Sequence, residues 1–171
     1  NGTSVGTVSA TDPDAGETFS YSLVDNAGGR FAINGATGEI TVADGSLLNY
    51  EAATSHSVTV RVTDSGGLTY DEAFTVNVND VNEVPTDLGL AGNTVDENAA
   101  NGTSVGTVSA SDPDAGETFT YSLTDDAGGL FKINSGTGVI TINAALDYET
   151  NASHNVTVKA TSSDGSTSTR T

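Results

Sequence analysis

The sequence predicts an all-β protein made of two tandem Greek-key β-sandwich domains, each with about seven strands. Three observations support this fold class. Apolar residues alternate with polar ones at the two-residue period of strands, glycine- and asparagine-rich turns separate these runs, and one sequence of domain size occurs twice. No segment shows a sustained helical period.

The repeat sets the domain organisation. Residues 1–19 and 101–119 differ only at Thr11, which is Ser111 in the second copy, so the period is 100 residues. A period of this size fits a whole sandwich domain and is too long for a solenoid turn. We therefore predict a first domain at 1–80, a linker at 81–85 and a second domain at 86–171.

The two copies are expected to be incomplete at opposite ends. The segment before the repeat in the second copy, residues 86–100, has no counterpart in the first, so the first domain should lack its first strand. Residues 70–79 have no counterpart after the second copy, so the second domain should lack its last strand.

Individual strands follow from the alternation. In the first copy, Val5, Val8 and Ala10 mark a strand whose uneven spacing predicts a β-bulge. Further strands are expected around residues 19–23, 40–42, 58–62 and 74–78, with equivalents at 119–123, 140–142 and 156–160. The opening strand of the second domain should include Val95.

Charge and composition limit the function. Acidic residues outnumber basic ones 23 to 5, which gives a formal net charge of −18. This charge argues against nucleic acid and anionic membranes as partners, and it favours cations. The sequence has no cysteine for disulfides or zinc–thiolate sites, and no apolar run long enough to cross a bilayer. The composition is typical of an extracellular or cell-surface β-protein.

The linker is unlike a flexible glycine–serine connector. It reads Asp80-Val81-Asn82-Glu83-Val84-Pro85, with two carboxylates, one side-chain amide and a closing proline. We interpret it as a stiff connector whose oxygens bind a hard cation, Ca²⁺, shared by the two domains.

An Asp-Pro-Asp sequence occurs once in each copy, at residues 12–14 and 112–114. Two aspartates around a conformationally restricted proline direct their carboxylates toward a common volume. An EF-hand loop is excluded, because position twelve counted from Asp12 is Leu23 instead of glutamate. Taken alone, the motif is equally compatible with a solvated turn that binds no metal.

Further acidic motifs recur at 48–51 and 146–149, and at 96–98. With these motifs in order, the chain resembles the cadherin family, in particular the cadherin-like tandem repeats of large bacterial surface adhesins. In that family an xEN motif, an LDxE motif, a linker motif, a DxD motif and a further aspartate converge at each domain junction and bind Ca²⁺. Residues 96–98, 146–149, 80–83 and 112–114 and Asp64 match these five motifs.

The resemblance implies one central site and two half-sites. The central junction would use Glu51, Asp80, Asn82, Glu83, Asp112 and Asp114, with Asp164 as a substitute ligand. The half-sites would be Asp12, Asp14 and Asp64 at one end, and Glu97, Asp147 and Glu149 at the other.

Two departures from the family pattern reduce the ligand count. Asn49 stands where the family prefers aspartate, and Ser162 occupies the position equivalent to Asp64. We therefore expect fewer ions at the junction than a complete family site holds.

The expected function is that of a calcium-rigidified spacer in an extracellular adhesin or surface fibre that mediates cell adhesion. Its partners would be neighbouring repeats of the same polypeptide or head-to-tail copies. An enzyme is disfavoured: His56 and His154 occupy matched positions before a strand, and the sequence has no nucleophile elbow or phosphate loop.

Two alternatives remain open. A polysaccharide-binding module would stack sugars on exposed aromatic rings, for which Tyr50, Tyr70 and Tyr148 are the candidates. A filament subunit would cover the edges left by the missing strands through strand donation between chains.

Overall fold

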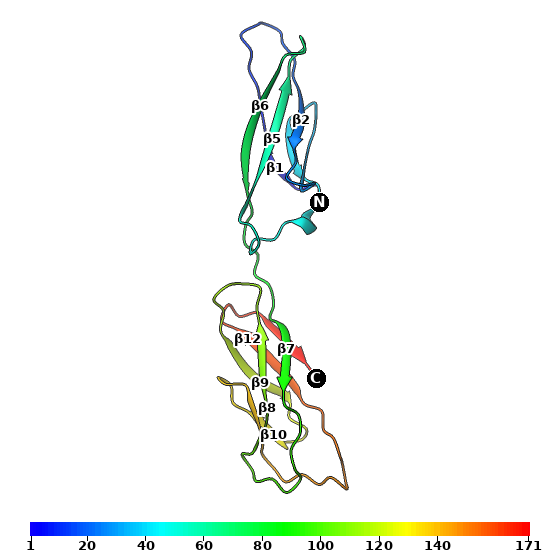
Figure 1. Cartoon of the computed structure of the whole chain (residues 1–171), viewed down its shortest axis with the longest axis vertical. Coiled ribbons are helices and arrows are strands. Elements are labelled where there is room, and N and C mark those ends of the chain that lie inside the picture. Colours follow the sequence, from blue (N-terminus) through cyan, green and yellow to red (C-terminus); the bar gives the residue numbers. More distant parts are fainter. The chain divides into compact units, whose positions relative to one another are not determined.

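The computed structural model describes residues 1–171, and the chain divides into two compact units, unit 1 (Asn1–Val81) and unit 2 (Asn82–Thr171) (Figure 1). Both units consist of antiparallel strands, and the single helical element is a 3₁₀ turn at Gly45–Leu47. The predicted all-β fold is confirmed. The structure contains no helix with the length and hydrophobicity needed to span a membrane.

Unit 1 contains two three-stranded sheets, with strand orders β1-β4-β3 and β2-β5-β6. The strands are β1 (Ser4–Thr7), β2 (Ser20–Asp25), β3 (Phe31–Ile33), β4 (Glu39–Val42), β5 (Ser55–Thr63) and β6 (Thr69–Asn77). The register between β1 and β4 shifts between Ser4 and Gly6, which confirms the predicted irregularity of the first strand, but β1 ends at Thr7 and does not include Val8 or Ala10.

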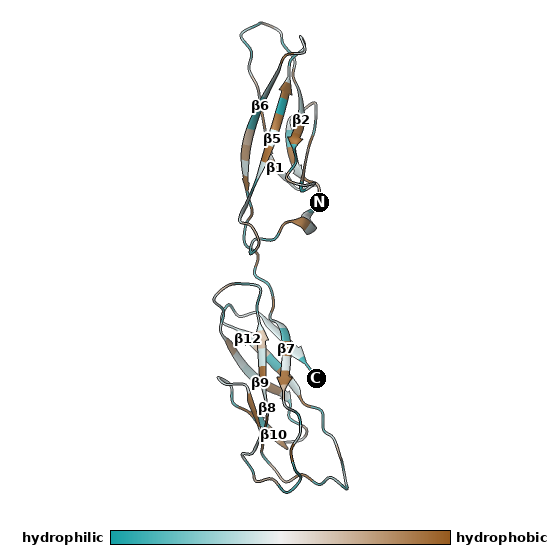
Figure 2. Ribbon diagram, in the orientation of Figure 1, coloured by the Kyte–Doolittle hydropathy of each residue, from teal (hydrophilic) through white to brown (hydrophobic).

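The core of unit 1 forms where the apolar faces of the two sheets meet. Its buried members are Phe31, Ile40, Val58 and Val60. Val58 and Val60 lie two positions apart on β5, so both project to the same face of the strand. Figure 2 shows this alternation of hydrophobic and hydrophilic residues along β5.

Unit 2 has the same plan with an additional first strand. Its sheets have the orders β10-β11-β8-β7 and β13-β12-β9. The strands are β7 (Thr86–Ala91), β8 (Ser104–Ser111), β9 (Phe119–Asp125), β10 (Phe131–Ile133), β11 (Val139–Ile142), β12 (Thr157–Ser162) and β13 (Thr167–Arg170). The buried core comprises Leu88, Val108, Tyr121, Phe131, Ile140, Val158 and Ala160.

Two details of unit 2 differ from the sequence-based expectation. The opening strand ends at Ala91 and does not reach Val95, because Gly92 adopts a positive φ of 85° that turns the chain out of the strand. The last strand, expected to be absent, is represented by β13, which pairs with β12 over four residues.

One glycine in each unit permits a close backbone approach. A Cβ on Gly38 would lie 2.4 Å from the carbonyl oxygen of Val8, and a Cβ on Gly138 would lie 2.4 Å from that of Val108. Both glycines also have a positive φ. The repeat therefore conserves a backbone contact that no residue with a side chain can make without displacement.

The units differ at the outer edge of the first repeated strand. In unit 2, β7 pairs with β8, and the Arg170 side chain donates a 2.6 Å hydrogen bond to the Leu88 carbonyl. Leu88 is only 7 % exposed. In unit 1 the equivalent strand, β1, has β4 as its one neighbour in the sheet. The sheet of unit 2 therefore contains one strand, β7, beyond those of the equivalent sheet of unit 1.

Candidate metal centres

The Asp-Pro-Asp turn of unit 2 follows directly from the end of β8. Asp112 Oδ1 accepts a 3.1 Å hydrogen bond from the Asp114 backbone N–H, which fixes the turn locally. Asp114 Oδ2 accepts a 3.0 Å hydrogen bond from the backbone N–H of Glu83. The turn is therefore hydrogen-bonded within itself and also to Glu83, near the beginning of unit 2.

A third carboxylate joins this turn. Asp112, Asp114 and Asp164 each offer an oxygen, and the three oxygens lie within 4.8 Å of one another. We call these residues the upper group. Asp112 and Asp114 are half-buried, and Asp112 Oδ2 is buried without a hydrogen-bond partner. Ser162 stands where the family has an aspartate ligand, and the sequence led us to expect Asp164 as the substitute ligand. The position of Asp164 beside Asp112 and Asp114 agrees with that expectation.

Asp164 is held in a tight turn between β12 and β13. Its Oδ1 accepts a 2.6 Å hydrogen bond from the Ser166 backbone N–H. This bond is the main reason that the pKa of Asp164 is lowered, and the side-chain amide of Asn82 lowers the same pKa further. The charged form that a cation requires is therefore favoured.

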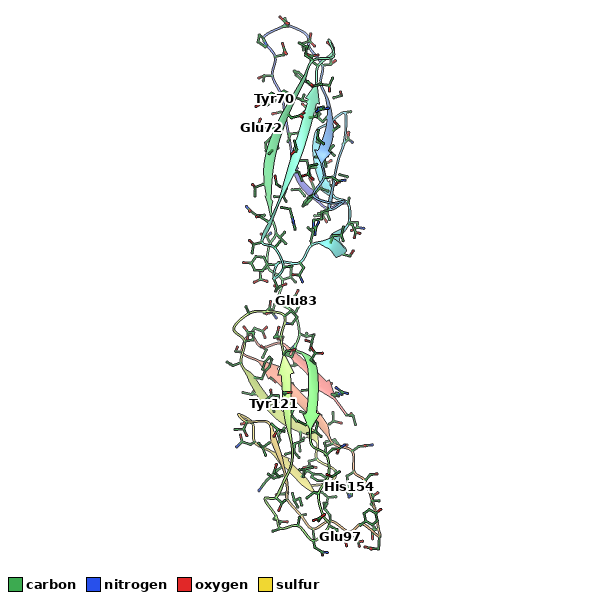
Figure 3. The ribbon with its side chains drawn as sticks, in the orientation of Figure 1. Tyr70, Glu72, Glu83, Glu97, Tyr121 and His154 are labelled. Carbon is green, nitrogen blue, oxygen red and sulfur yellow. The ribbon has the colours of Figure 1, made fainter.

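A second acidic group lies elsewhere in unit 2, in the loops that follow β7 and β11. Oxygens of Glu97, Asp147 and Glu149 lie within 4.8 Å of one another, and we call these residues the lower group. Figure 3 labels Glu97 of this group. Glu97 accepts a 3.0 Å hydrogen bond from the Tyr148 backbone N–H. Asp147 accepts hydrogen bonds from the Thr150 hydroxyl and backbone N–H, and the hydroxyl contributes most to lowering its pKa.

Unit 1 brings together fewer of the expected ligands. Carboxylate oxygens of Glu51 and Asp80 lie within 4.8 Å of each other. Asn49, the family departure, uses its Oδ1 to accept a 2.6 Å hydrogen bond from Ala52.

Asp12, Asp14 and Asp64 are not among the groups whose oxygens converge in this way. The oxygens of Asp12 and Asp64 serve local turns instead: Asp12 Oδ1 accepts from the Asp14 backbone N–H at 2.9 Å, and Asp64 Oδ1 accepts from that of Leu68 at 2.8 Å.

The donor sets fit Ca²⁺. Two oxygens bound to one Ca²⁺ at 2.3–2.6 Å lie at most about 5 Å apart, which the upper and lower groups satisfy. All donors are oxygens, which hard cations prefer. The salt bridge between Arg61 and Asp71 uses none of these carboxylates. The negative charge of the two groups therefore has no partner among the ion pairs of the chain.

The two histidines take no part in these groups. His56 lies 6.3 Å from the ring of Phe31, and His154 lies 5.9 Å from the ring of Phe131, measured between ring centroids. Both histidines thus pack beside the same core position of their own unit, as expected of a repeated residue at a strand edge.

The sequence analysis did not single out Glu117. Its Oε2 accepts hydrogen bonds from the hydroxyls of Ser162 and Ser163 and from the backbone N–H of Asp164. The recurrence of glutamate at this position in both copies could have identified it, since Glu17 occupies the same position in the first copy and accepts hydrogen bonds from Ser65. Both glutamates lie inside the repeated sequence but outside any recognised motif.

Comparison with known proteins gives consistent matches. A family model described as the cadherin domain matches residues 1–79 and 93–171. The chain is 38 % identical over 171 residues to Protocadherin Fat 4 of Mus musculus, covering 93 % of this chain and 3 % of that protein. It is 38 % identical over 170 residues to the Protocadherin-like wing polarity protein stan of Drosophila melanogaster, covering 93 % of this chain and 5 % of that protein. The chain therefore spans a small part of the length of these relatives.

Solved structures give the same likeness. The crystal structure of mouse Cadherin-23 EC22-24 matches with a TM-score of 0.70 and 27 % identity, covering 98 % of this chain and 57 % of that chain. Protocadherin Gamma B2 extracellular cadherin domains 3-6 match with a TM-score of 0.71 and 24 % identity, covering 99 % of this chain and 41 % of that chain. The second likeness supports the fold alone.

Proposed function

The chain belongs to the cadherin domain family, and on this premise we propose that it is an extracellular adhesion repeat in which Ca²⁺ stiffens the junction between unit 1 and unit 2. Cadherin domains are adhesion modules, and no enzymatic activity is proposed. The observation that carries the proposal is the upper group of unit 2, whose three carboxylate oxygens lie within 4.8 Å of one another.

The covalent chain supports a shared site. Asp80 of unit 1 and Asn82 of unit 2 are separated by Val81 alone. Their Cα atoms therefore lie no more than about 7 Å apart. Unit 1 adds the paired carboxylates of Glu51 and Asp80, and unit 2 adds the upper group. We propose that these residues, with Asn82 and Glu83, form one binding site.

Electrostatics explains how such a site would stiffen the chain. Without a cation, the carboxylates of the two units repel one another at neutral pH, and the repulsion is strongest where solvent is excluded. A bound Ca²⁺ ion would neutralise this charge and be coordinated by oxygens of both units at once. Unit 1 would supply Glu51 and Asp80 as ligands, and unit 2 would supply Asp112, Asp114 and Asp164. Binding energy appears as resistance to bending and to unfolding.

The half-sites extend this proposal to an array. The lower group, Glu97, Asp147 and Glu149, would be completed by a neighbouring repeat or by a head-to-tail copy. Asp12, Asp14 and Asp64 would contribute to the opposite end, provided that a cation draws them together. Calcium bound to either half-site alone should be weaker, because fewer oxygens are available.

Small-angle X-ray scattering of the whole chain tests this function. Millimolar Ca²⁺ should narrow the distribution of interatomic distances relative to the chelated protein, and it should raise the melting temperature. Identical profiles and melting curves with calcium and with chelator would refute the proposal. Magnesium at the same concentration serves as the control, because it accommodates a cage of many carboxylates poorly.

Placement of the chain within a bacterial surface adhesin is part of the proposal. It rests on the motif pattern of the sequence, whereas the named curated relatives are animal proteins. Polysaccharide is a further proposed ligand, for which Tyr70 of β6 (labelled in Figure 3) and Tyr148 are the most exposed aromatic residues, each 64 % exposed. A glycan array would detect it, and loss of a signal in Tyr70→Ala would assign the ring involved.

A second candidate function is strand acceptance from a neighbouring copy. Unit 1 carries a groove of about 400 Å³ lined by residues 8–12, which follow β1, and by residues of β2, β5 and β6. Leu68 and Tyr70 at its margin are 76 % and 64 % exposed. In unit 2 the equivalent edge is covered by β7. We propose that an extended segment with the pattern of β7, from a neighbouring copy, occupies the groove.

One sequence difference between the two copies affects how strongly unit 1 should bind such a strand. Arg170 pairs with Val158 in unit 2, and Glu72 pairs with the equivalent Val60 in unit 1. Glu72 cannot make the side-chain donation that Arg170 makes to Leu88, so the strand should bind unit 1 more weakly than β7 binds unit 2.

A labelled peptide covering residues 85–92 should bind the chain, and the same peptide with Leu88→Asp should not. Fluorescence anisotropy measures both. No binding by the first peptide, together with a monomer at high concentration in light scattering, would exclude strand acceptance.

A further inference from the structure

A single carboxylate connects the two loops that supply the upper group. Glu117 follows the Asp112–Asp114 turn by three residues, and its Oε2 reaches the turn between β12 and β13. It accepts a 2.8 Å hydrogen bond from the Ser162 hydroxyl and a 3.0 Å hydrogen bond from the Asp164 backbone N–H. The Ser163 hydroxyl also donates to it.

These contacts fix the residue that carries the third ligand. The backbone N–H of Asp164 is bound by Glu117, and its Oδ1 is bound by the Ser166 backbone N–H. Ser162, the first residue of the turn, is buried, and its backbone N–H donates to the Ser166 carbonyl. The turn therefore has few ways to move without breaking a charge-assisted hydrogen bond.

The first copy provides a natural comparison. Glu17 accepts hydrogen bonds from the hydroxyl and backbone N–H of Ser65, which is equivalent to Ser163. The residue equivalent to Asp164 is Gly66, so no carboxylate is held at that position. Asp12, Asp14 and Asp64 do not converge in unit 1. The same glutamate thus accompanies a converged group only where the serine it binds is followed by an aspartate, Asp164, and not where it is followed by Gly66.

We infer that Glu117 is a positioning residue for cation binding at the upper group. It does not bind the ion; its charge is satisfied by Ser162, Ser163 and the Asp164 backbone. It holds Asp164 opposite Asp112 and Asp114 before any ion arrives, so less conformational entropy is lost when an ion binds. This inference rests on the proposed calcium function.

Ser163→Ala tests the positional effect, because it leaves every carboxylate in place while it removes a donor to Glu117 and the acceptor of the Thr118 backbone N–H. Glu117→Ala removes the whole contact, and Glu117→Gln retains an acceptor oxygen without the charge. Glu39→Gln, at a strand position outside both groups, controls for the loss of one negative charge. If Glu117→Ala fails to fold, Ser163→Ala still tests the inference.

Calcium titrations followed by nuclear magnetic resonance provide a readout for each group. The amide signal of Asp164 reports the upper group, and that of Thr150 reports the lower group in the same sample. We expect Glu117→Ala to weaken calcium binding at Asp164 by about 10-fold or more. Ser163→Ala should weaken it about 3-fold, Glu117→Gln by an intermediate amount, and the Thr150 titration should be unchanged.

A second measurement separates positioning from charge. Hydrogen exchange at the amides of 164–166 should accelerate in Ser163→Ala without calcium, when no ion contributes to the result. Unchanged exchange and an unchanged Asp164 midpoint in both Ser163→Ala and Glu117→Ala would overturn the inference. If Asp164 shows no response to calcium in the unsubstituted chain, the proposed function itself fails instead.

Discussion

The backbone N–H of Glu83 donates a 3.0 Å hydrogen bond to Oδ2 of Asp114. This bond joins the second residue of unit 2 to the Asp-Pro-Asp turn that lies 31 residues later in the chain. Asp114 therefore has two tasks: one oxygen orders the segment that follows the linker, and the carboxylate as a whole contributes to the upper group. Any change at Asp114 must be interpreted with both tasks in view.

Asp114→Asn should separate these tasks. The asparagine keeps an acceptor oxygen for the Glu83 N–H, so the fold without calcium should be preserved. Loss of one charged oxygen should weaken calcium binding at the upper group by about 10-fold or more. Isothermal titration calorimetry measures the affinity, and Glu39→Gln is the matched control for charge. Equal affinities for Asp114→Asn and Glu39→Gln would contradict the assignment of Asp114 as a ligand.

Asn49→Asp should strengthen the proposed junction. Aspartate keeps the acceptor that binds the Ala52 N–H and adds a negative charge two positions before Glu51, at the position where the family prefers aspartate. We expect tighter calcium binding, a higher melting temperature with calcium and a slightly lower one with chelator, because the added charge is then unneutralised. Differential scanning calorimetry in the two conditions tests this. A parallel shift in both conditions would show that the substitution acts on the fold alone.

Stability without calcium should fall in acid partly through Asp147. The Thr150 hydroxyl, followed by its backbone N–H, lowers the pKa of Asp147 below its ordinary value of 3.8. The unfolded chain then binds the proton more readily than the folded chain. The contribution of Asp147 is therefore complete above the ordinary pKa, and it disappears as the pH falls through the lowered pKa of the folded state.

Thr150→Ala removes the largest cause of this shift, so the pKa of Asp147 should move up toward its ordinary value. Carboxyl-detected nuclear magnetic resonance titration measures that pKa directly. Thr124→Ala, which removes a hydroxyl that donates to the Thr157 carbonyl, is the control and should leave Asp147 unchanged. An unchanged Asp147 titration in Thr150→Ala would show that the hydroxyl does not set the pKa.

Gly138→Ala should destabilise unit 2 far more than Gly128→Ala. Both glycines have a positive φ, 69° and 72°, so each alanine carries a backbone penalty of about 1 kcal/mol. The added Cβ at Gly138 would also lie 2.4 Å from the Val108 carbonyl oxygen, whereas that at Gly128 meets nothing within 4 Å. We expect a loss of about 3 kcal/mol or more for Gly138→Ala. Chemical denaturation that gives equal losses would contradict this close approach.

Much of the fold could be predicted from local pattern. Alternation located the central strands, such as the β5 run that buries Val58 and Val60, because side chains of a strand point to opposite faces in turn. The ends of the edge strands could not be predicted in this way. Val95 has the residue type of a strand, but Gly92 turns the backbone before it, and the register with β8 determines where pairing stops.

For the candidate site, the sequence predicted which residue types would act as ligands better than it predicted which of those residues lie close together. Asp112 and Asp114 are close because only Pro113 separates them, and spacing alone establishes that. Asp164 lies 50 residues further along, and its approach depends on the pairing of β12 with β9 and on the turn held by Glu117. Asp64 had the better motif match but does not converge with Asp12 and Asp14.

The sequence by itself determined the fold class, the repeat and the kind of ligand the chain offers, because period, repetition and charge are properties of order and composition. The tertiary structure decided which carboxylates approach one another, which edge of each unit is covered and which glutamate orders the turn beside Asp164. These outcomes depend on distances between residues far apart in the chain, and such distances are fixed only when strands pair and loops are held by hydrogen bonds.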